Sequence, residues 1–453
     1  MLLNRLVFVV AFFSFAWLSS PDASSQTVRS KRITRLFWQD RETQQLSYAD
    51  LVASGKWGLQ RGWVKGFPKL DSEKQHLSQM QSSGGVVMVA VSDGDQGKSQ
   101  SGWVAFDSGV FEEPHGNHFH WRYTRTPTVG QSKLDSQQGN PSRVYDYNNT
   151  FYVPTSSKTG FVQAVPGSLK ISGSAKGVRS YTGGGGRTSL AAVNGSVCYA
   201  TWSDDDGENA GRVDVVNLKK PSDQPVYSFR LPSGAIHSAT ANAGKVFFAT
   251  GNGVYWVSAD TSLTGSAETV QVNTVALDSN AASSTGELTN EGSSVIFTAG
   301  TADLSTICIV NAAFSTPAVT KLPISVAEGL RLANLRTVLS LGKRYAFVFQ
   351  ERVDPASDVK EQLTVVELDP NRDRSFNDAR VKATMPVGAS KVNGDYGHHD
   401  ITFDAYGRYA VLTNPGDGAL TLMSVSDLRV RARFLVSGVP DNIIAVGASE
   451  HFH

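Results

Sequence analysis

A short turn followed by an apolar run recurs seven times along this chain and constrains its fold more than any other feature. Each copy has Gly or Asn in a tight turn and four to six apolar residues after it, as in AGKVFFATGNG. The intervals between copies run from 46 to 65 residues, which suits a β-propeller blade of three or four short strands. The turns lie at Gly85, Asn149, Gly195, Gly244, Gly292, Gly342 and Gly407.

Between the turns, β-branched and aromatic runs alternate with clusters of Gly, Asn, Asp and Ser, and sustained helical periodicity is scarce. We therefore predict an all-β fold, a β-propeller with seven blades. Eight blades are the alternative, because residues 41–80 are irregular and have room for one more. Separate sandwich domains would need linkers that the chain lacks. Residues 32–40 and the closing NIIAVG segment are expected to share a blade and close the ring.

The N-terminus has the pattern of an export signal. Residues 1–5 are short and positive, residues 6–18 are apolar, and small residues precede an expected cleavage near Ser25. The apolar run is shorter than the roughly 20 residues that cross a membrane, so cleavage is favoured over a retained anchor. We expect a signal peptide over residues 1–25, one propeller over residues 26–453, and a periplasmic or secreted protein.

Charge and cysteine content narrow the classes of partner. The 42 Lys and Arg residues balance 41 Asp and Glu residues, so the chain lacks the dense positive charge that binds nucleic acid or anionic lipid. We expect a monomer whose partners are small or neutral. Only Cys198 and Cys308 are present, and they lie two repeat units apart. Buried free thiols are therefore predicted in place of a disulfide.

Seven of the nine His residues fall in three short clusters. The first, EEPHGNHFHW, lies in one of the two longest intervals. In an extended segment His118 and His120 point to the same side, and Gly116 gives the backbone freedom to bring His115 round. Three convergent neutral imidazoles can hold zinc, with water or a neighbouring carboxylate as the fourth ligand.

The second cluster, GHHD, lies in the other long interval. In a propeller the strand before the tight turn is commonly innermost, so equivalent positions on different blades converge on the channel. His237 lies seven residues before its turn and His399 lies eight before its own; both are expected at the channel mouth. His398 competes with His399 for the inward position, and Asp400 is expected on the opposite side of the strand from His399.

Insertions in propellers tend to fall on loops of one face, often the binding face. The first two clusters are therefore expected where function usually lies. The third cluster, His451 and His453 beside Glu450, repeats the alternating His arrangement at the C-terminus. It is a further candidate for metal binding, with a tail of no function as the alternative.

Three stretches resemble a known family: AFDSGVFEEPHGNHFH, AIHSATANAGKVFFATGNGVYWV and GVPDNIIAVGASEHFH. They are similar to the propeller-type periplasmic zinc metallochaperones of ABC-type zinc importers, the AztD-like group. The resemblance implies one zinc ion at the channel mouth and a mobile His motif that passes zinc to a solute-binding partner. It assigns His115, His118 and His120 to the mobile motif, and His237, His398, His399 and Asp400 to the central site.

The predicted function is zinc binding and transfer without catalysis. Two alternatives stay open. One is a metal-dependent hydrolase or lyase with His399 or Asp400 as its base; the other is a metal-free surface propeller that binds a protein or glycan. Imidazole ligands also suit copper and nickel, so the pattern alone does not separate these metals from zinc.

Overall fold

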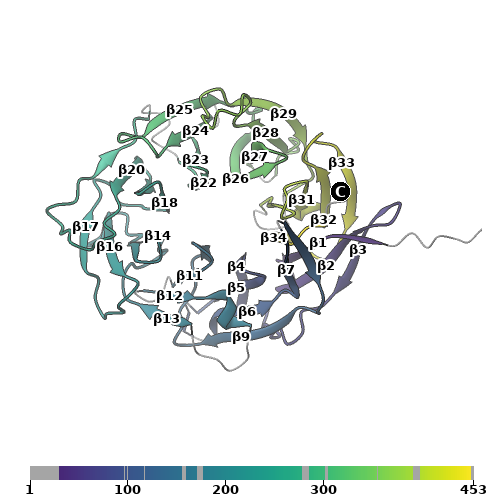
Figure 1. Cartoon of the computed structure of the whole chain (residues 1–453), viewed down its shortest axis with the longest axis horizontal. Coiled ribbons are helices and arrows are strands. Elements are labelled where there is room, and N and C mark those ends of the chain that lie inside the picture. Colours follow the sequence, from purple (N-terminus) through teal and green to yellow (C-terminus); the bar gives the residue numbers. More distant parts are fainter. Residues whose placement is uncertain are drawn as a thin grey trace, which may run out of the picture.

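The structure is a computed structural model that describes residues 30–449 with short gaps. Within these residues the chain forms eight four-stranded antiparallel sheets, arranged as blades around a central channel (Figure 1). The fold is an eight-bladed β-propeller. The predicted signal peptide and the C-terminal His residues lie outside the described part. The gaps are residues 96, 99, 117, 156–159, 171–176, 278–284, 301–304, 355 and 391–397.

Seven of the blades follow one another along the chain, and each has its first strand innermost. A short helix, α1 (Pro166–Leu169), and a 3₁₀ turn, η2 (Pro415–Asp417), interrupt the strands. The strands of these blades are β4 (Gln75–Ser83), β5 (Val86–Asp93), β6 (Ser101–Asp107) and β9 (Thr128–Asp135); β10 (Tyr145–Asp146), β11 (Phe151–Pro154), β12 (Phe161–Ala164) and β13 (Val178–Tyr181); β14 (Leu190–Val193), β15 (Val197–Thr201), β16 (Arg212–Asn217) and β17 (Tyr227–Arg230); β18 (Ser238–Asn242), β19 (Lys245–Thr250), β20 (Gly253–Ser258) and β21 (Asn273–Thr274); β22 (Thr289–Glu291), β23 (Ser294–Ala299), β24 (Thr306–Asn311) and β25 (Ala318–Pro323); β26 (Leu330–Ser340), β27 (Lys343–Arg352), β28 (Gln362–Glu367) and β29 (Arg380–Pro386); β30 (Ile401–Phe403), β31 (Tyr409–Asn414), β32 (Ala419–Ser424) and β33 (Val430–Leu435).

The eighth blade joins the two ends of the chain, as predicted. Its innermost strand is β34 (Pro440–Val446), and β1 (Lys31–Asp40), β2 (Gln45–Ala53) and β3 (Trp57–Gly62) follow outward. In the antiparallel register Arg35 pairs with Val446. The alternative count of eight blades is therefore the correct one. This closing blade has no turn between its first two strands, because they come from opposite ends of the chain, so a count of turns misses it.

Aromatic and β-branched side chains from adjacent blades pack together and form the cores. Between the blades of β15 and β19, for example, Tyr199, Phe229 and Phe248 pack with ring centroids 6.2 to 6.4 Å apart. Cys198 and Cys308 are buried free thiols, as predicted, and burial raises the pKa of the Cys198 thiol. Among the described helices, none is long and apolar enough to cross a membrane.

The two faces of the ring carry different loops. The turn face holds the turns between the first and second strands, such as the one at Gly85; the start face is the opposite side, where the innermost strands begin. Asp107 at the end of β6 pairs with Val86 at the beginning of β5, so the chain after β6 emerges on the turn face. There it forms the additional hairpin of β7 (Val110–His115) and β8 (His118–Tyr123).

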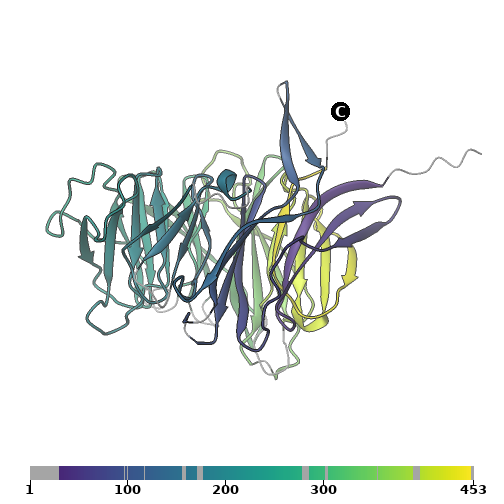
Figure 2. The same ribbon diagram turned by 90° about the horizontal axis from the view of Figure 1, so that it is seen from below.

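The hairpin projects away from the ring (Figure 2). By contrast, His398 precedes β30 and lies at the start face. It lines a cavity there together with His76, which is at the beginning of β4. The expectation that the two His-bearing insertions share one binding face is therefore wrong. One insertion follows the third strand of its blade and the other precedes a first strand, and these connections lie at opposite ends of a blade.

Candidate functional site

The β7–β8 hairpin carries the first His cluster on one of its faces. Backbone pairing joins His115 to His118 and Glu113 to His120, and residues paired directly across a ribbon share a face. The imidazoles of His115 and His120 contact edge to face, with ring centroids 5.0 Å apart. Glu113 accepts a hydrogen bond from Nε of Arg122 at 2.6 Å. The hairpin register thus gathers the three predicted His positions next to a carboxylate.

The closing blade holds the root of this hairpin in place. Arg35 of β1 and Asp50 of β2 form a buried ion pair, with Nε 2.7 Å from Oδ1. Nη1 of Arg35 donates to the carbonyl oxygen of Ser108 at 2.6 Å and to that of Arg125 at 2.9 Å. These carbonyls lie just before and just after the hairpin, so charge-assisted hydrogen bonds fix both of its ends.

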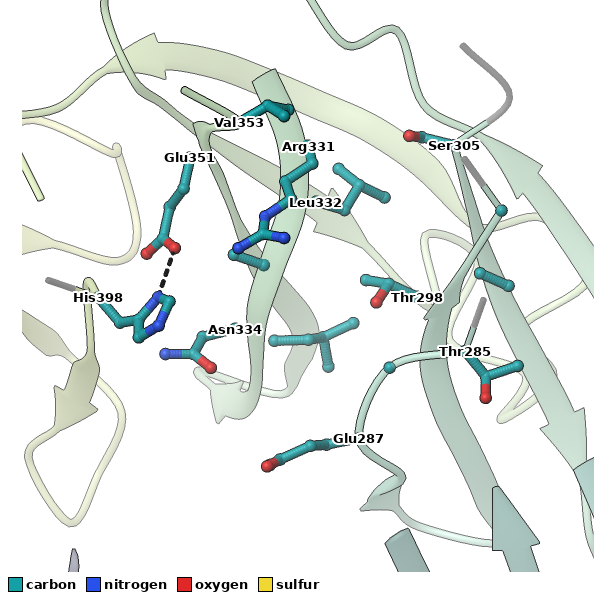
Figure 3. Close-up of a pocket in the computed structure, with 15 residues that line it drawn as sticks. Thr285, Glu287, Thr298, Ser305, Arg331, Leu332, Asn334, Glu351, Val353 and His398 are labelled. Carbon is teal, nitrogen blue, oxygen red and sulfur yellow. Dashed lines mark hydrogen bonds and ion pairs between the residues drawn. The ribbon is translucent and has the colours of Figure 1, made fainter. Parts of the chain in front are cut away.

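His398 lies in the channel wall at the start face. Its Nδ1 is 2.8 Å from Oε2 of Glu351, a buried carboxylate near the end of β27 (Figure 3). The hydrogen bond with Glu351 raises the pKa of His398 above its usual value, although burial opposes the shift. Arg331 and Asn334 line the same cavity of about 650 Å³. His398 is therefore the inward residue of the GHHD cluster.

His399 is fully buried, and the prediction that it faces the channel mouth is wrong. Its ring stacks on Phe349 with centroids 4.9 Å apart. Nδ1 is 2.7 Å from the carbonyl oxygen of Thr413, and Nε2 is 3.2 Å from Oε2 of Glu361. Both ring nitrogens are thus paired inside the blade, which suits a structural residue better than a metal ligand or a catalytic base.

Asp400 lies on the channel side, opposite His399, as the strand alternation predicts. It borders a cavity of about 730 Å³ at the start face together with His398 and Asp441. Its Oδ1 is 3.4 Å from Nη2 of Arg336. Burial, aided by the charge of Asp400, raises the pKa of Asp441 to about 6, while Arg41 acts against the shift. This part of the wall thus combines carboxylates, arginines and one His.

His237 does not join His398 in one cavity. It borders a separate cavity of about 1000 Å³, with Thr188 at the corresponding position of the preceding blade. Its Nε2 is 2.9 Å from the carbonyl oxygen of Thr285 on the next blade. Glu287 borders both the cavity of His237 and that of His398. The predicted central site is therefore spread along the channel wall.

A metal centre is not assembled in the described part of the chain: no three His, Cys, Asp or Glu side chains there are grouped closely enough to hold an ion. His451 and His453 lie outside the described residues, as does the cleavage expected near Ser25.

The sequence reasoning missed the buried carboxylates that orient the His pair. Glu351 bonds His398, and Glu361 bonds His399. The sequence contains a signal for Glu351, which directly follows the mostly apolar run YAFVFQ. A carboxylate that continues a buried strand needs a nearby hydrogen-bonding partner. Asp441 stands at the start of the closing strand, and its position next to His398 depends on ring closure between distant segments.

Comparison with known proteins supports the fold. No family model matches the chain, and no curated protein matches it. Among solved structures, AztD from Citrobacter koseri superposes with a TM-score of 0.64 at 13% identity, covering 93% of this chain and 100% of that one. The structure of apo AztD from the same organism gives 0.62 at 14% identity with the same coverage. At this identity the similarity establishes a shared propeller architecture.

Proposed function

We infer that this chain is a zinc-binding protein whose metal site is built on the β7–β8 hairpin. The observation that carries the proposal is the contact between the His115 and His120 rings, on a ribbon whose register pairs His115 with His118. Imidazole nitrogens ligate zinc at about 2.0–2.1 Å in tetrahedral sites. Small rotations of neighbouring side chains on a single face can bring such nitrogens together, while more distant residues would require movement of the backbone.

The projecting position suits delivery of a metal better than catalysis on a substrate. The hairpin stands away from the ring (Figure 2), so a partner protein can approach its His residues directly. Ligands can then be exchanged one at a time, which avoids release of a bare ion. The proposed activity is therefore binding and transfer of zinc, and the protein is not proposed to be an enzyme.

The resemblance of the His-bearing stretches to the AztD-like zinc metallochaperones, together with the structural similarity to AztD, extends the proposal to location and partner. In this scheme the signal peptide directs export to the periplasm, and the solute-binding protein of a zinc importer receives the metal. The wall around His398 has a secondary place in the scheme. Glu351 already bonds that imidazole and favours its protonated form, and a proton competes with metal for the ring.

The test is metal analysis of the mature protein, purified without chelator and then titrated against one. Wild type is expected to carry about one equivalent of zinc, and the variant H115A/H118A/H120A is expected to lose it. Phe119→Ala is the matched control, because Phe119 is exposed and lies on the other face of the same hairpin. This variant should bind zinc as the wild type does.

Other results would point to other functions. Zinc retained by the triple variant would move the site to the channel wall. Failure to bind zinc at micromolar concentration would favour a metal-free propeller that binds a protein or glycan. Chelator-sensitive turnover of an ester, phosphate or glycan would indicate an enzyme. Parallel titrations with copper and nickel establish which metal the site prefers.

A further inference from the structure

A cavity at the start face contains polar groups that the described part of the protein leaves unused. It has a volume of about 650 Å³ and is lined by residues of the blades of β22 and β26, together with His398. Binding sites for small molecules have volumes of about 300–1,000 Å³. The size of this cavity therefore suits a small-molecule ligand.

An extension of two strands builds one wall of the cavity. β26 has 11 residues and is the longest of the described strands, whereas the innermost strands of the other blades have two to nine. The register between β26 and β27 shifts between Leu332 and Leu335, which places Asn334 in a β-bulge. Bulges redirect side chains and are common next to functional sites. The blades of this propeller form without such an extension, so the longer wall points to a function.

Arg331 extends from this wall into the cavity beside Glu351 (Figure 3). The two residues are paired directly in the strand register, so their side chains share a face. Glu351 is already engaged, because Oε1 accepts from the backbone N–H of His399 at 2.7 Å and Oε2 is 2.8 Å from Nδ1 of His398. Among the described residues, the guanidinium of Arg331 has no hydrogen-bond or ion-pair partner. Its donors are therefore available to a ligand.

The cavity also offers acceptors. Asn334 donates its amide N–H to the carbonyl oxygen of His399 at 2.7 Å, which leaves its Oδ1 for a donor. Glu287 forms an ion pair with Arg143 of another blade, and a carboxylate can accept several hydrogen bonds. The hydroxyl of Thr298 lines the same space (Figure 3). The cavity thus combines a cationic donor with a set of acceptors, one of which is negative.

We propose that this cavity binds a free α-amino acid. The carboxylate of the ligand binds the guanidinium of Arg331 in the bidentate geometry that arginine offers. The ammonium of the ligand has three donors and no acceptor, and it donates to Glu287 and to Oδ1 of Asn334. This inference goes beyond the proposed function, because it concerns a second ligand on the face of the ring opposite the hairpin.

The charge of Glu287 favours a zwitterion over a simple anion. A carboxylate or phosphate without an amine would satisfy Arg331, but it would meet the negative charge of Glu287 with no positive group to offset it. Such like-charge contacts select against the wrong ligand. An amino acid supplies both charges, and the rest of the cavity has room for its side chain.

The experiment is calorimetric titration of the full mature chain with each of the common L-amino acids. At least one should bind saturably at millimolar concentration or below. Arg331→Gln is expected to lower the association constant of the tightest binder by at least about tenfold, or 1.4 kcal/mol. This variant should fold normally, because Arg331 is exposed. Arg187→Gln is the matched control, since Arg187 is an exposed arginine that lines the adjacent cavity of His237.

Changes to the ligand test its two ends separately. The amide of the tightest binder lacks the carboxylate, and the N-acetyl derivative lacks the ammonium; each should bind at least about tenfold more weakly. The proposal is wrong if no amino acid binds at millimolar concentration, or if the amide binds as tightly as the free amino acid. Equal affinity in Arg331→Gln and wild type, or equal losses in Arg331→Gln and Arg187→Gln, would also overturn it.

Repeating the titration with H115A/H118A/H120A separates this site from the zinc site, because amino acids can themselves bind zinc. The variant should bind the amino acid as the wild type does. Loss of binding would show that the amino acid binds metal at the hairpin, which overturns this inference and leaves the proposed function standing. Amino-acid binding by a wild-type protein that takes up no zinc would support this inference and refute the proposed function.

Discussion

His399 and Glu361 form a buried pair in which Nε2 of the imidazole lies 3.2 Å from Oε2 of the carboxylate. The side chains of both residues are almost completely inaccessible to solvent, at 0% and 1% exposure. The pair joins the residue just before β28 of one blade to the segment before β30 of the next. His399 therefore helps to hold two blades together from inside the wall whose surface carries His398.

Replacing His399 by Ala is expected to destabilise the propeller by about 3–5 kcal/mol, because it leaves the Glu361 charge buried without this partner. Chemical denaturation followed by tryptophan fluorescence measures the loss. The folded variant should still bind zinc at the hairpin. A loss of zinc with unchanged stability would instead show that His399 belongs to the metal site.

The stability should also depend on pH through Glu361. Burial would raise its pKa, but hydrogen bonds from His399, from Ser390 and from the backbone N–H of Arg352 bring it down to about 2. An acid with a lowered pKa contributes stability above its unfolded value, near 4.5, and loses it as pH falls toward 2. The contribution at neutral pH is about 3 kcal/mol.

Acid unfolding of wild type and Glu361→Gln measures this contribution. The variant should start from lower stability at pH 7 and lose less of it between pH 4.5 and 2. Equal acid sensitivity in the two proteins would show that other carboxylates govern this range.

At the channel wall, Glu351→Gln should lower the pKa of His398 toward the usual 6.5, because the hydrogen bond that the imidazole donates to the Glu351 carboxylate is the main cause of the upward shift. NMR titration of the imidazole resonances gives the value directly. For a His with a raised pKa, the stabilising contribution is present below pH 6.5 and is lost as pH rises through the folded pKa. An unchanged midpoint in the variant would contradict the pairing in Figure 3.

Asp50→Ala tests the clamp at the hairpin root. The substitution leaves Arg35 buried without its carboxylate and should cost about 3 kcal/mol or more in unfolding free energy. Hydrogen exchange should also rise at residues 108–125, since Arg35 fixes both ends of the hairpin. Glu42→Ala, a carboxylate in the exposed loop after β1, is the matched control. If the variant is less stable but exchange at the hairpin is not faster, the Arg35–Asp50 pair stabilises the blade and does not fix the hairpin.

Much of the architecture follows from the turn pattern, because each turn marks one junction between the first and second strands. The error at His399 came from a slip of one residue. It lies eight residues before its turn, whereas the channel-lining position lies seven before, and a shift of one moves a side chain to the other face of a strand. Residues seven before a turn do line start-face cavities: Ser78, Ser142, Thr188, His237, Thr285 and Asp400.

The intervals between the repeat turns do not by themselves show on which face of the ring each His cluster lies. Both long intervals contain an insertion, but their lengths do not reveal which strand each insertion follows. The partners Glu351 and Glu361 come from a neighbouring blade, and they pair with His398 and His399 across separations of 47 and 38 residues in the chain. Only the strand register of the hairpin shows that His115 and His120 lie on the same face.

The pairing of β1 with β34 also sets the order in which the protein can be completed. Among the described strands β1 is the first to be synthesised and β34 is the last, so the ring stays open until β34 has left the ribosome. Until then β1 exposes a pairing edge, which is a site for misassociation with another chain. A circular permutant that joins the two ends and opens the ring between two other blades would remove this dependence on the final strand.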